Sequence, residues 1–151
     1  MNSKSIGNIG EAKVLAKLVE LGIPVYLPFG DNEKADLIAE FNGKLNKIQI
    51  KTSTRAKNGK ITFGLTSSTS HRKNGGTHVY DSSEIDFFAC YNTVRDKIYL
   101  ISINDSPDNH ITIRYENPKN NQFKGINFEE KYLIDNVLCL NWFFLHFSAK
   151  Y

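Results

Sequence analysis

Hydrophobic residues recur along the N-terminal part of the chain at the spacing of a helix. In residues 10–22, GEAKVLAKLVELG, they form one apolar stripe, which consists of Val14, Leu15, Leu18 and Leu21. Asn8 or Ser5 is expected to cap the start of this helix, and Gly22 is expected to end it. Glu11 lies on the same stripe, so the pattern places a carboxylate on the face that packs against the rest of the protein.

Most of the remaining chain consists of short runs with alternating apolar and polar positions, which is the pattern of strands. These runs are residues 23–29, 36–41, 44–51, 60–68, 85–92, 97–103 and 110–116. Residues 67–80 are polar and contain Gly75-Gly76, so they are expected to form a mobile loop. The tail, residues 128–147, is too apolar to be left in solvent, and its pattern does not distinguish a helix from a strand.

Two of these runs, residues 36–41 and 44–51, are joined by Asn42-Gly43, which is a strong signal for a two-residue hairpin turn. With such a turn, Phe41 faces Lys44 across the hairpin. The length of the turn then determines every other pair, and a one-residue bulge would move each side chain to the other face.

Counting outward from that turn pairs Asp36 with Gln49, with about 4.5 to 5.5 Å between their Cβ atoms. Lys51, two residues beyond Gln49, projects from the same face. The opposite face is apolar and carries Leu37, Ala39, Phe41, Ile48 and Ile50. An acid, an amide and an ammonium group are therefore expected to converge at one end of the hairpin.

These groups suit a hard divalent cation that is bound by oxygen atoms. Asp36 supplies a carboxylate oxygen, Gln49 an amide oxygen, and Ile50 a backbone carbonyl oxygen. Beside such a site, Lys51 favours deprotonation of a water molecule and offsets the charge on a phosphate under attack, so phosphodiester hydrolysis is indicated. The plain alternative is that Asp36 and Lys51 form an ordinary exposed ion pair. For Glu11, the alternative is that it complements the positive end of its helix.

Charge is distributed unevenly along the chain. The protein has a net charge of +3 and 16 acidic residues, yet none of these lies between Phe41 and Tyr80, where Lys and Arg are frequent. This segregation favours a polyanion as the partner, and the alternative is a solvated basic face without one. The candidate phosphate contacts are Lys44, Lys47, Arg55, Lys57 and Lys60. The candidate readers of base edges are His71, Arg72, Lys73 and His78, although the two histidines also fit plain solvated loop positions.

The overall composition is that of an ordinary globular protein. A chain of 151 residues is expected to form one domain. No segment reaches the roughly 18 apolar residues of a membrane span, and the N-terminus lacks the apolar run of a signal peptide, so a cytoplasmic location and no membrane partner are expected. Cys90 and Cys139 lie in apolar runs and are expected to be reduced core cysteines.

The order of the candidate residues resembles the PD-(D/E)XK nuclease superfamily. Asp36 is followed by twelve residues and then by Gln49-Ile50-Lys51, and Glu11 lies in a preceding helix. Within that superfamily the chain is most similar to the homing endonucleases of group I introns. The similar segments are NIGEAKVLAKLVELGIPVYLP, KADLIAEFNGKLNKIQIKTS, IDFFACYN and IYLISI. The resemblance covers residues 7–103, which would form the catalytic core.

This resemblance implies an α/β fold with a restriction-endonuclease-like core, in which helices flank a mixed β-sheet. It implies Mg²⁺ as cofactor, with Mn²⁺ able to replace it, and a site in which Glu11 reaches the same metal. The implied catalytic residues are Glu11, Asp36, Gln49 and Lys51. Two positions depart from the family pattern, because Ala35 replaces a proline and Gln49 replaces an acid. The second change removes one negative ligand, so metal binding is expected to be weaker or more dependent on Glu11.

The function expected from these observations is site-specific cleavage of double-stranded DNA by a homing endonuclease. One active site cuts one strand, so a homo-oligomer, a dimer or a tetramer, is expected. The C-terminal third is a candidate for the interface, and the alternative for its apolar tail is plain core. A Holliday-junction resolvase of the same fold and a non-catalytic DNA-binding domain with a decayed site are the competing functions. An RNA-binding module is disfavoured, because Phe63 and Tyr80 are too few exposed aromatic residues for it.

Overall fold

The computed structural model describes residues 2–30, 33–68, 75–119 and 122–139. One long helix precedes a series of strands, and a short helix at residues 134–139 follows them. The elements, in chain order, are α1 (Ser3–Glu20), β1 (Val25–Tyr26), β2 (Leu37–Phe41), β3 (Lys44–Ser53), β4 (Lys60–Gly64), β5 (Ser67–Ser68), β6 (Thr77–His78), β7 (Phe87–Asn92), β8 (Lys97–Ser102), η1 (Ile103–Asp105), β9 (His110–Arg114), β10 (Asn127–Phe128) and η2 (Glu129–Lys131).

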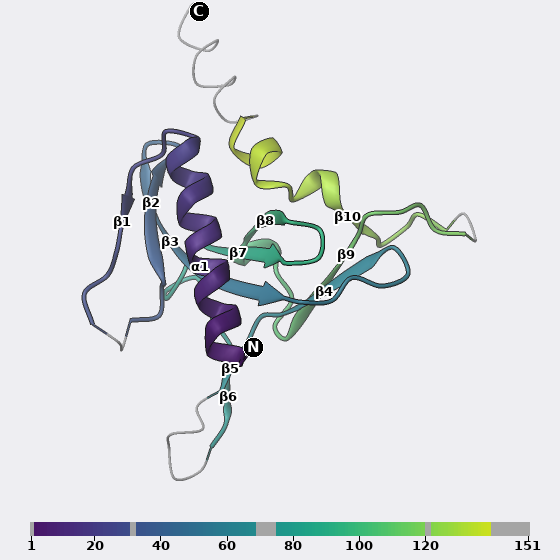
Figure 1. The fold of residues 1–151 in the computed structure, drawn as a ribbon, viewed down its shortest axis with the longest axis horizontal. Helices are drawn as coiled ribbons and strands as arrows, with labels where there is room; N and C mark the ends of the chain where they lie inside the picture. Colours follow the sequence, from purple (N-terminus) through teal and green to yellow (C-terminus); the bar gives the residue numbers. More distant parts are fainter. Residues whose placement is uncertain (1, 31–32, 69–74, 120–121, 140–151) are drawn as a thin grey trace, which may run out of the picture.

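A five-stranded mixed sheet forms the centre of the fold, in the order β1-β2-β3-β7-β8 (Figure 1). β3 and β7 run parallel, whereas the other neighbours in this sheet are antiparallel. A parallel pair needs a long connection, and here that connection contains β4 and the small β5-β6 hairpin. A three-stranded sheet, β10-β9-β4, completes the architecture. The expected α/β fold with a mixed sheet is confirmed.

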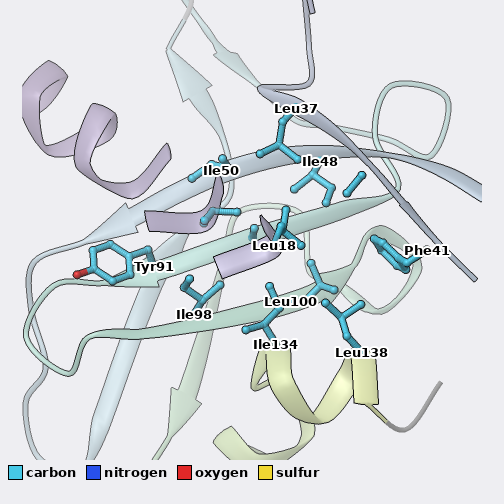
Figure 2. Close-up of a cluster of buried hydrophobic side chains, with 13 residues drawn as sticks. Leu18, Leu37, Phe41, Ile48, Ile50, Tyr91, Ile98, Leu100, Ile134 and Leu138 are labelled. Carbon is cyan, nitrogen blue, oxygen red and sulfur yellow. The ribbon is translucent and has the colours of Figure 1, made fainter. Parts of the chain in front are cut away.

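Hydrophobic side chains are buried on both faces of the central sheet. On one face, α1 and the helix at residues 134–139 cover the first cluster, which is drawn in Figure 2. On the other face, β4 and β9 cover a second cluster, to which β7 contributes Phe88 and Cys90 and β8 contributes Tyr99 and Ile101. Because β7 and β8 are covered on both faces, their sequences are nearly continuous apolar runs.

The hairpin of β2 and β3 has the predicted turn and the predicted register. Asn42 and Gly43 both have positive φ, at 56° and 68°, as a two-residue type I′ turn requires. Phe41 pairs with Lys44, and at the far end Leu37 pairs with Ile48. No bulge interrupts this ladder, so the face that packs against α1 carries Leu37, Ala39, Phe41, Ile48 and Ile50, and the other face carries Lys47, Gln49 and Lys51.

Helix α1 begins earlier than the apolar stripe indicated. Asn2 is the N-cap, and its side chain accepts a hydrogen bond from the Ser5 backbone N–H at 2.8 Å. Asn8 and Ser5 are therefore inside the helix, and the predicted caps were wrong. The first turns of α1 contain no buried residue and no periodic apolar pattern, so the sequence pattern did not reveal them. Gly22 does end the helix, with a φ of 71°. No helix among the described residues, α1 included, combines the length and hydropathy needed to cross a membrane.

The face that α1 buries consists of Gly10, Val14 and Leu18. Gly10 lies against β3: a Cβ atom built on it would be 1.9 Å from Oγ1 of Thr52. Oγ1 of Thr52 is buried there, and it has no hydrogen-bond partner within the described part of the chain. The glycine therefore allows the helix backbone to approach the strand that carries the candidate site.

Two other expectations are corrected, and one open alternative is decided in part. Residues 67–80 are not simply a loop, because β5 and β6 pair, with Ser67 opposite His78. For the apolar tail, whose pattern did not distinguish a helix from a strand, Phe128 ends β10, Glu129–Lys131 form η2, residues 134–139 are helical, and residues 140–147 lie outside the described residues. Cys90 is buried as expected, but Cys139 is exposed, so the expectation that it is a core residue was wrong.

Candidate active site

The hairpin places Asp36 directly beside β3. Its backbone N–H donates to the Ile48 carbonyl at 2.9 Å, which continues the ladder by one residue. Its Oδ2 accepts hydrogen bonds from Nε2 of Gln49 at 2.8 Å and from the backbone N–H of Ile50 at 2.6 Å. The predicted meeting of Asp36 and Gln49 is therefore present, and the acid is held by its neighbours on the opposite strand.

Lys51 lies on the same face of β3, and its ammonium group is held by residues outside the hairpin. Nζ donates to the Thr66 carbonyl at 2.9 Å and to Oγ of Ser67 at 3.0 Å, and it lies 5.0 Å from the centre of the Tyr80 ring. Sequence reasoning placed Lys51 correctly but missed these three partners. Their contact depends on the β5-β6 pairing, and strands of two residues leave no periodic pattern to detect.

Burial is the main cause of the pKa shifts of Asp36 and Lys51. Burial raises the pKa of Asp36, and this effect outweighs the hydrogen bond from Ile50 and the attraction of Lys51, both of which act to lower it. Burial likewise lowers the pKa of Lys51, against the opposing effect of Asp36. The two groups are therefore desolvated charges at the end of the hairpin, and they differ from an ordinary exposed ion pair.

Glu11 projects from the middle of α1 and is exposed, so the expectation that it faces inward was wrong. It does not complement the helix N-terminus either, because the first turn of α1 contains no acidic residue. Glu11 is instead within electrostatic range of Asp36. Partial burial and the Asp36 carboxylate both raise the pKa of Glu11. It lies at the rim of the site, beside the contact between Gly10 and β3.

These residues fit a divalent cation. Oδ1 of Asp36 and the carboxylate of Glu11 accept no hydrogen bond from the described residues, and the Asp36 carboxylate is close enough to Glu11 to raise the pKa of Glu11. The backbone carbonyl of Ile50 lies 3.4 Å from Nε2 of Gln49, so it belongs to the same cluster. Oxygen atoms of this kind are the ligands that Mg²⁺ prefers. The described ranges contain no group of three or more His, Cys, Asp and Glu side chains that could hold a metal ion, and in this cluster Gln49 stands where the family pattern has an acid.

The candidate DNA contacts are only partly available. Nζ of Lys44 donates to Oδ1 of Asp86 at 2.6 Å, and Nζ of Lys47 donates to the Ser83 carbonyl at 2.5 Å. Asp86 also accepts from the Lys47 backbone N–H at 2.9 Å, so a distant acid neutralises part of the basic stretch. Lys44 is nevertheless exposed, and Arg55, Lys57 and Lys60 are exposed as well. The remaining predicted contacts, His71, Arg72 and Lys73, lie outside the described residues.

Comparison with known proteins identifies the family of the chain. The family model for PD-(D/E)XK endonucleases matches residues 1–135, and the chain belongs to this family. Nucleases of this family generally use divalent metal ions, and the family implies DNA as the substrate. Comparison with curated proteins gives no significant match.

Among solved structures, the fold is similar to that of a bacterial homing endonuclease, I-Ssp6803I. The TM-score is 0.71 at 20% sequence identity, and the alignment covers 99% of this chain and 98% of the other. At this identity the likeness establishes the fold alone.

Replacing Asp36 by asparagine is expected to stabilise the metal-free protein. A carboxyl whose pKa is higher in the folded than in the unfolded chain opposes folding when it is ionised, so its contribution worsens as the pH rises above about 4, the ordinary value for aspartate. Asparagine keeps an oxygen for the hydrogen bonds from Gln49 and Ile50. We expect thermal unfolding at pH 7 to shift upward by about 2 to 4 °C, which corresponds to ~1 kcal/mol in a chain of this size.

The measurement is calorimetry in EDTA at several pH values. The rise in unfolding temperature is expected to become smaller as the pH falls toward about 4, where the wild-type carboxyl also becomes neutral. Asp108→Asn, an exposed position, controls for the loss of one negative charge. A lower unfolding temperature for Asp36→Asn at pH 7 would show that the charge of Asp36 does not oppose folding.

Proposed function

We propose that this chain is a site-specific double-stranded DNA endonuclease, a homing endonuclease that acts with Mg²⁺, or with Mn²⁺ in its place. The observation that carries the proposal is the cluster of Asp36, Gln49 and Lys51, held in register by the hairpin turn in a chain of the PD-(D/E)XK endonuclease family. The fold likeness to a homing endonuclease supports the choice within that family.

Four groups would hold the cation: Glu11, Asp36, Gln49 and the backbone carbonyl of Ile50. When bound, the ion supplies Lewis-acid activation of the scissile phosphate and of the attacking water. Asp36 is oriented for this role by the two hydrogen bonds to its Oδ2, which leave Oδ1 available. Nε2 of Gln49 donates to Asp36, so its amide oxygen is the atom left to face the ion or to orient a water molecule.

Lys51 would donate to a nonbridging oxygen of the phosphate. An ammonium group has three N–H donors, and the described residues accept two of those of Lys51. The third is available for the substrate, and the partial burial of the charge strengthens its effect on a developing negative charge. Arg55, Lys57 and Lys60 would contact phosphates along the duplex, together with Lys44, Lys47, His71, Arg72 and Lys73.

One such site cuts one strand, so cleavage of both strands requires two copies related by symmetry, and we propose a homo-oligomer of single-domain subunits in the cytoplasm. The whole chain of 151 residues would form the nuclease domain, with the C-terminal third available for assembly. Cleavage of an intron-free target, the event that starts intron homing, would be the biological use of this activity.

A pooled library of randomised linear duplexes tests the proposal. The wild-type protein is incubated with the library in Mg²⁺, in Mn²⁺ and in EDTA, and the cut ends are sequenced. We expect cuts at one long, roughly symmetric site in either metal and none in EDTA, with Asp36→Asn inactive throughout. Duplex binding without cutting in either metal would favour a non-catalytic DNA-binding domain, and a preference for four-way junctions would favour a resolvase.

Gln49→Glu is expected to tighten binding of the divalent ion. The change restores a third carboxylate to the cluster, and oxygen sites bind divalent cations more tightly as their negative charge increases. We expect the dissociation constant for Mn²⁺, measured by calorimetry without DNA, to fall by roughly tenfold. The metal-free variant is expected to be less stable than wild type, because three carboxylates then repel one another.

Thr62→Glu is the matched control, since it adds the same charge at an exposed position on β4. It is expected to leave the dissociation constant for Mn²⁺ unchanged. Weaker binding of Mn²⁺ by Gln49→Glu than by wild type would contradict the proposed ligand set.

A further inference from the structure

The ammonium group of Lys51 is contacted by residues from both ends of the segment 66–80. Ser67 begins β5 and accepts a hydrogen bond from Nζ at 3.0 Å, and the preceding carbonyl of Thr66 accepts another at 2.9 Å. Tyr80, two residues after β6, brings its ring to 5.0 Å from Nζ. The pairing of β5 with β6 brings these two ends together beside the lysine.

Tyr80 is itself held in place from several sides. Its hydroxyl group is hydrogen-bonded to Oγ of Ser67 at 2.5 Å, so the same hydroxyl of Ser67 contacts both Tyr80 and Lys51. Its ring meets Phe88 edge-on at 5.6 Å and His78 edge-on at 4.8 Å between centroids. Nε2 of His78 is in turn bonded to Oε2 of Glu84 at 2.8 Å. The ring that faces Lys51 therefore has little freedom to turn away.

We propose that Tyr80 is a positioning residue for Lys51, with Ser67 as its partner, and that the two together direct the ammonium group toward the scissile phosphate. This inference rests on the proposed nuclease function. A four-carbon side chain loses considerable entropy when it is held in one geometry, and an aromatic face attracts a cation without using any of its N–H donors. The ring thereby confines Lys51 while leaving its third donor for the substrate.

Removal of the ring is expected to slow cleavage without weakening DNA binding. Tyr80→Leu should lower the single-turnover rate on the duplex recovered from the library by about tenfold, the loss that corresponds to a partly desolvated cation–π contact. Tyr80→Phe keeps the ring and should restore the rate to within about threefold of wild type, since it loses only the hydroxyl contact. Ser67→Ala should lower the rate by about fivefold, which corresponds to one lost hydrogen bond to a charged group.

Duplex affinity, measured in Ca²⁺, is expected to be unchanged in all three variants, because none of them removes a phosphate contact. Val79→Ala is the matched control: Val79 adjoins Tyr80 in the chain, its side chain is 43% exposed, and its replacement should change neither quantity.

A second readout requires neither metal nor DNA. Because the ring lies 5.0 Å from Nζ, we expect its ring current to shift the nearby Lys51 side-chain proton signals upfield in the NMR spectrum of the free protein. The shift should persist in Tyr80→Phe and disappear in Tyr80→Leu, and the dispersion of the same spectrum reports whether each variant is folded.

The outcomes separate this inference from the proposed function. If wild type cuts no duplex while the Tyr80-dependent shift is present, the proposed function fails but the geometric relation of Tyr80 to Lys51 stands. If the shift is absent in wild type, or if folded Tyr80→Leu cleaves as fast as or faster than wild type, the positioning role is overturned. A loss of duplex affinity in Tyr80→Leu that equals its loss of rate would instead make Tyr80 a DNA contact.

Discussion

Lys51→Ala is expected to reduce the single-turnover rate of DNA cleavage by about 10² to 10³-fold, the usual loss when one donor to a developing negative charge is removed. Duplex affinity should remain close to that of wild type, because Lys51 is directed into the site and held by Thr66 and Ser67. The measurement is a rapid-quench time course with excess protein, together with a separate binding titration in Ca²⁺.

Lys47→Ala is the matched control for this prediction, since Lys47 lies on the same face of β3, four residues earlier. Its Nζ donates a hydrogen bond to the Ser83 carbonyl and not to the residues that hold Lys51. We expect this variant to cleave at a normal rate once bound and to show a smaller dependence of binding on salt. Equal losses of affinity and rate in Lys51→Ala would assign Lys51 to general attraction of the duplex.

Gly10→Ala is expected to produce the largest loss of stability of the substitutions considered. The added Cβ would lie 1.9 Å from Oγ1 of Thr52 and 3.2 Å from its Cβ, and both atoms belong to a short side chain on a buried strand. Helix α1 must therefore move away from β3. Overpacking of this kind typically costs about 1 to 3 kcal/mol, and we expect a net loss of about 2 kcal/mol in the free energy of unfolding in urea.

Two further variants check the cause of this loss. Gly7→Ala, one turn earlier in α1, meets no atom within 4 Å and is expected to stabilise the protein by up to about 1 kcal/mol through helix propensity. Thr52→Ala combined with Gly10→Ala removes the clashing hydroxyl and should recover most of the loss. If Gly10→Ala were as stable as Gly7→Ala, the close approach of α1 to β3 would be refuted.

The central hairpin could be predicted from the sequence because residues that are close together in the chain determine it. The Asn42-Gly43 turn determines the register, and the register determines that Asp36 meets Gln49. The sequence left a one-residue bulge in the turn open, and the structure shows an uninterrupted ladder. The family resemblance added Glu11 to this group. In the structure, Glu11 is close enough to Asp36 for the Asp36 carboxylate to raise the pKa of Glu11.

Contacts between distant residues could not be predicted in the same way. Asp86 lies about forty positions from the lysines that it contacts, so the acid-free stretch looked more basic in the sequence than it is in space. Tyr80 appeared only as the end of a polar loop, and its contact with Lys51 depends on a pairing of very short strands. The stripe on α1 placed Glu11 on the buried face, because it could not show that Gly10 is the point of closest approach.

The different connections of β3 to its two neighbours have a consequence for the order of folding. β3 meets β2 through a turn of two residues, whereas its parallel partner β7 begins more than thirty residues later. Hairpins form in about 1 to 10 μs, and pairing across a long connection is slower because more chain entropy is lost before contacts compensate. The residues that carry the proposed chemistry therefore belong to the segment that can assemble first during synthesis, before the elements that hold Lys51 in place have been translated.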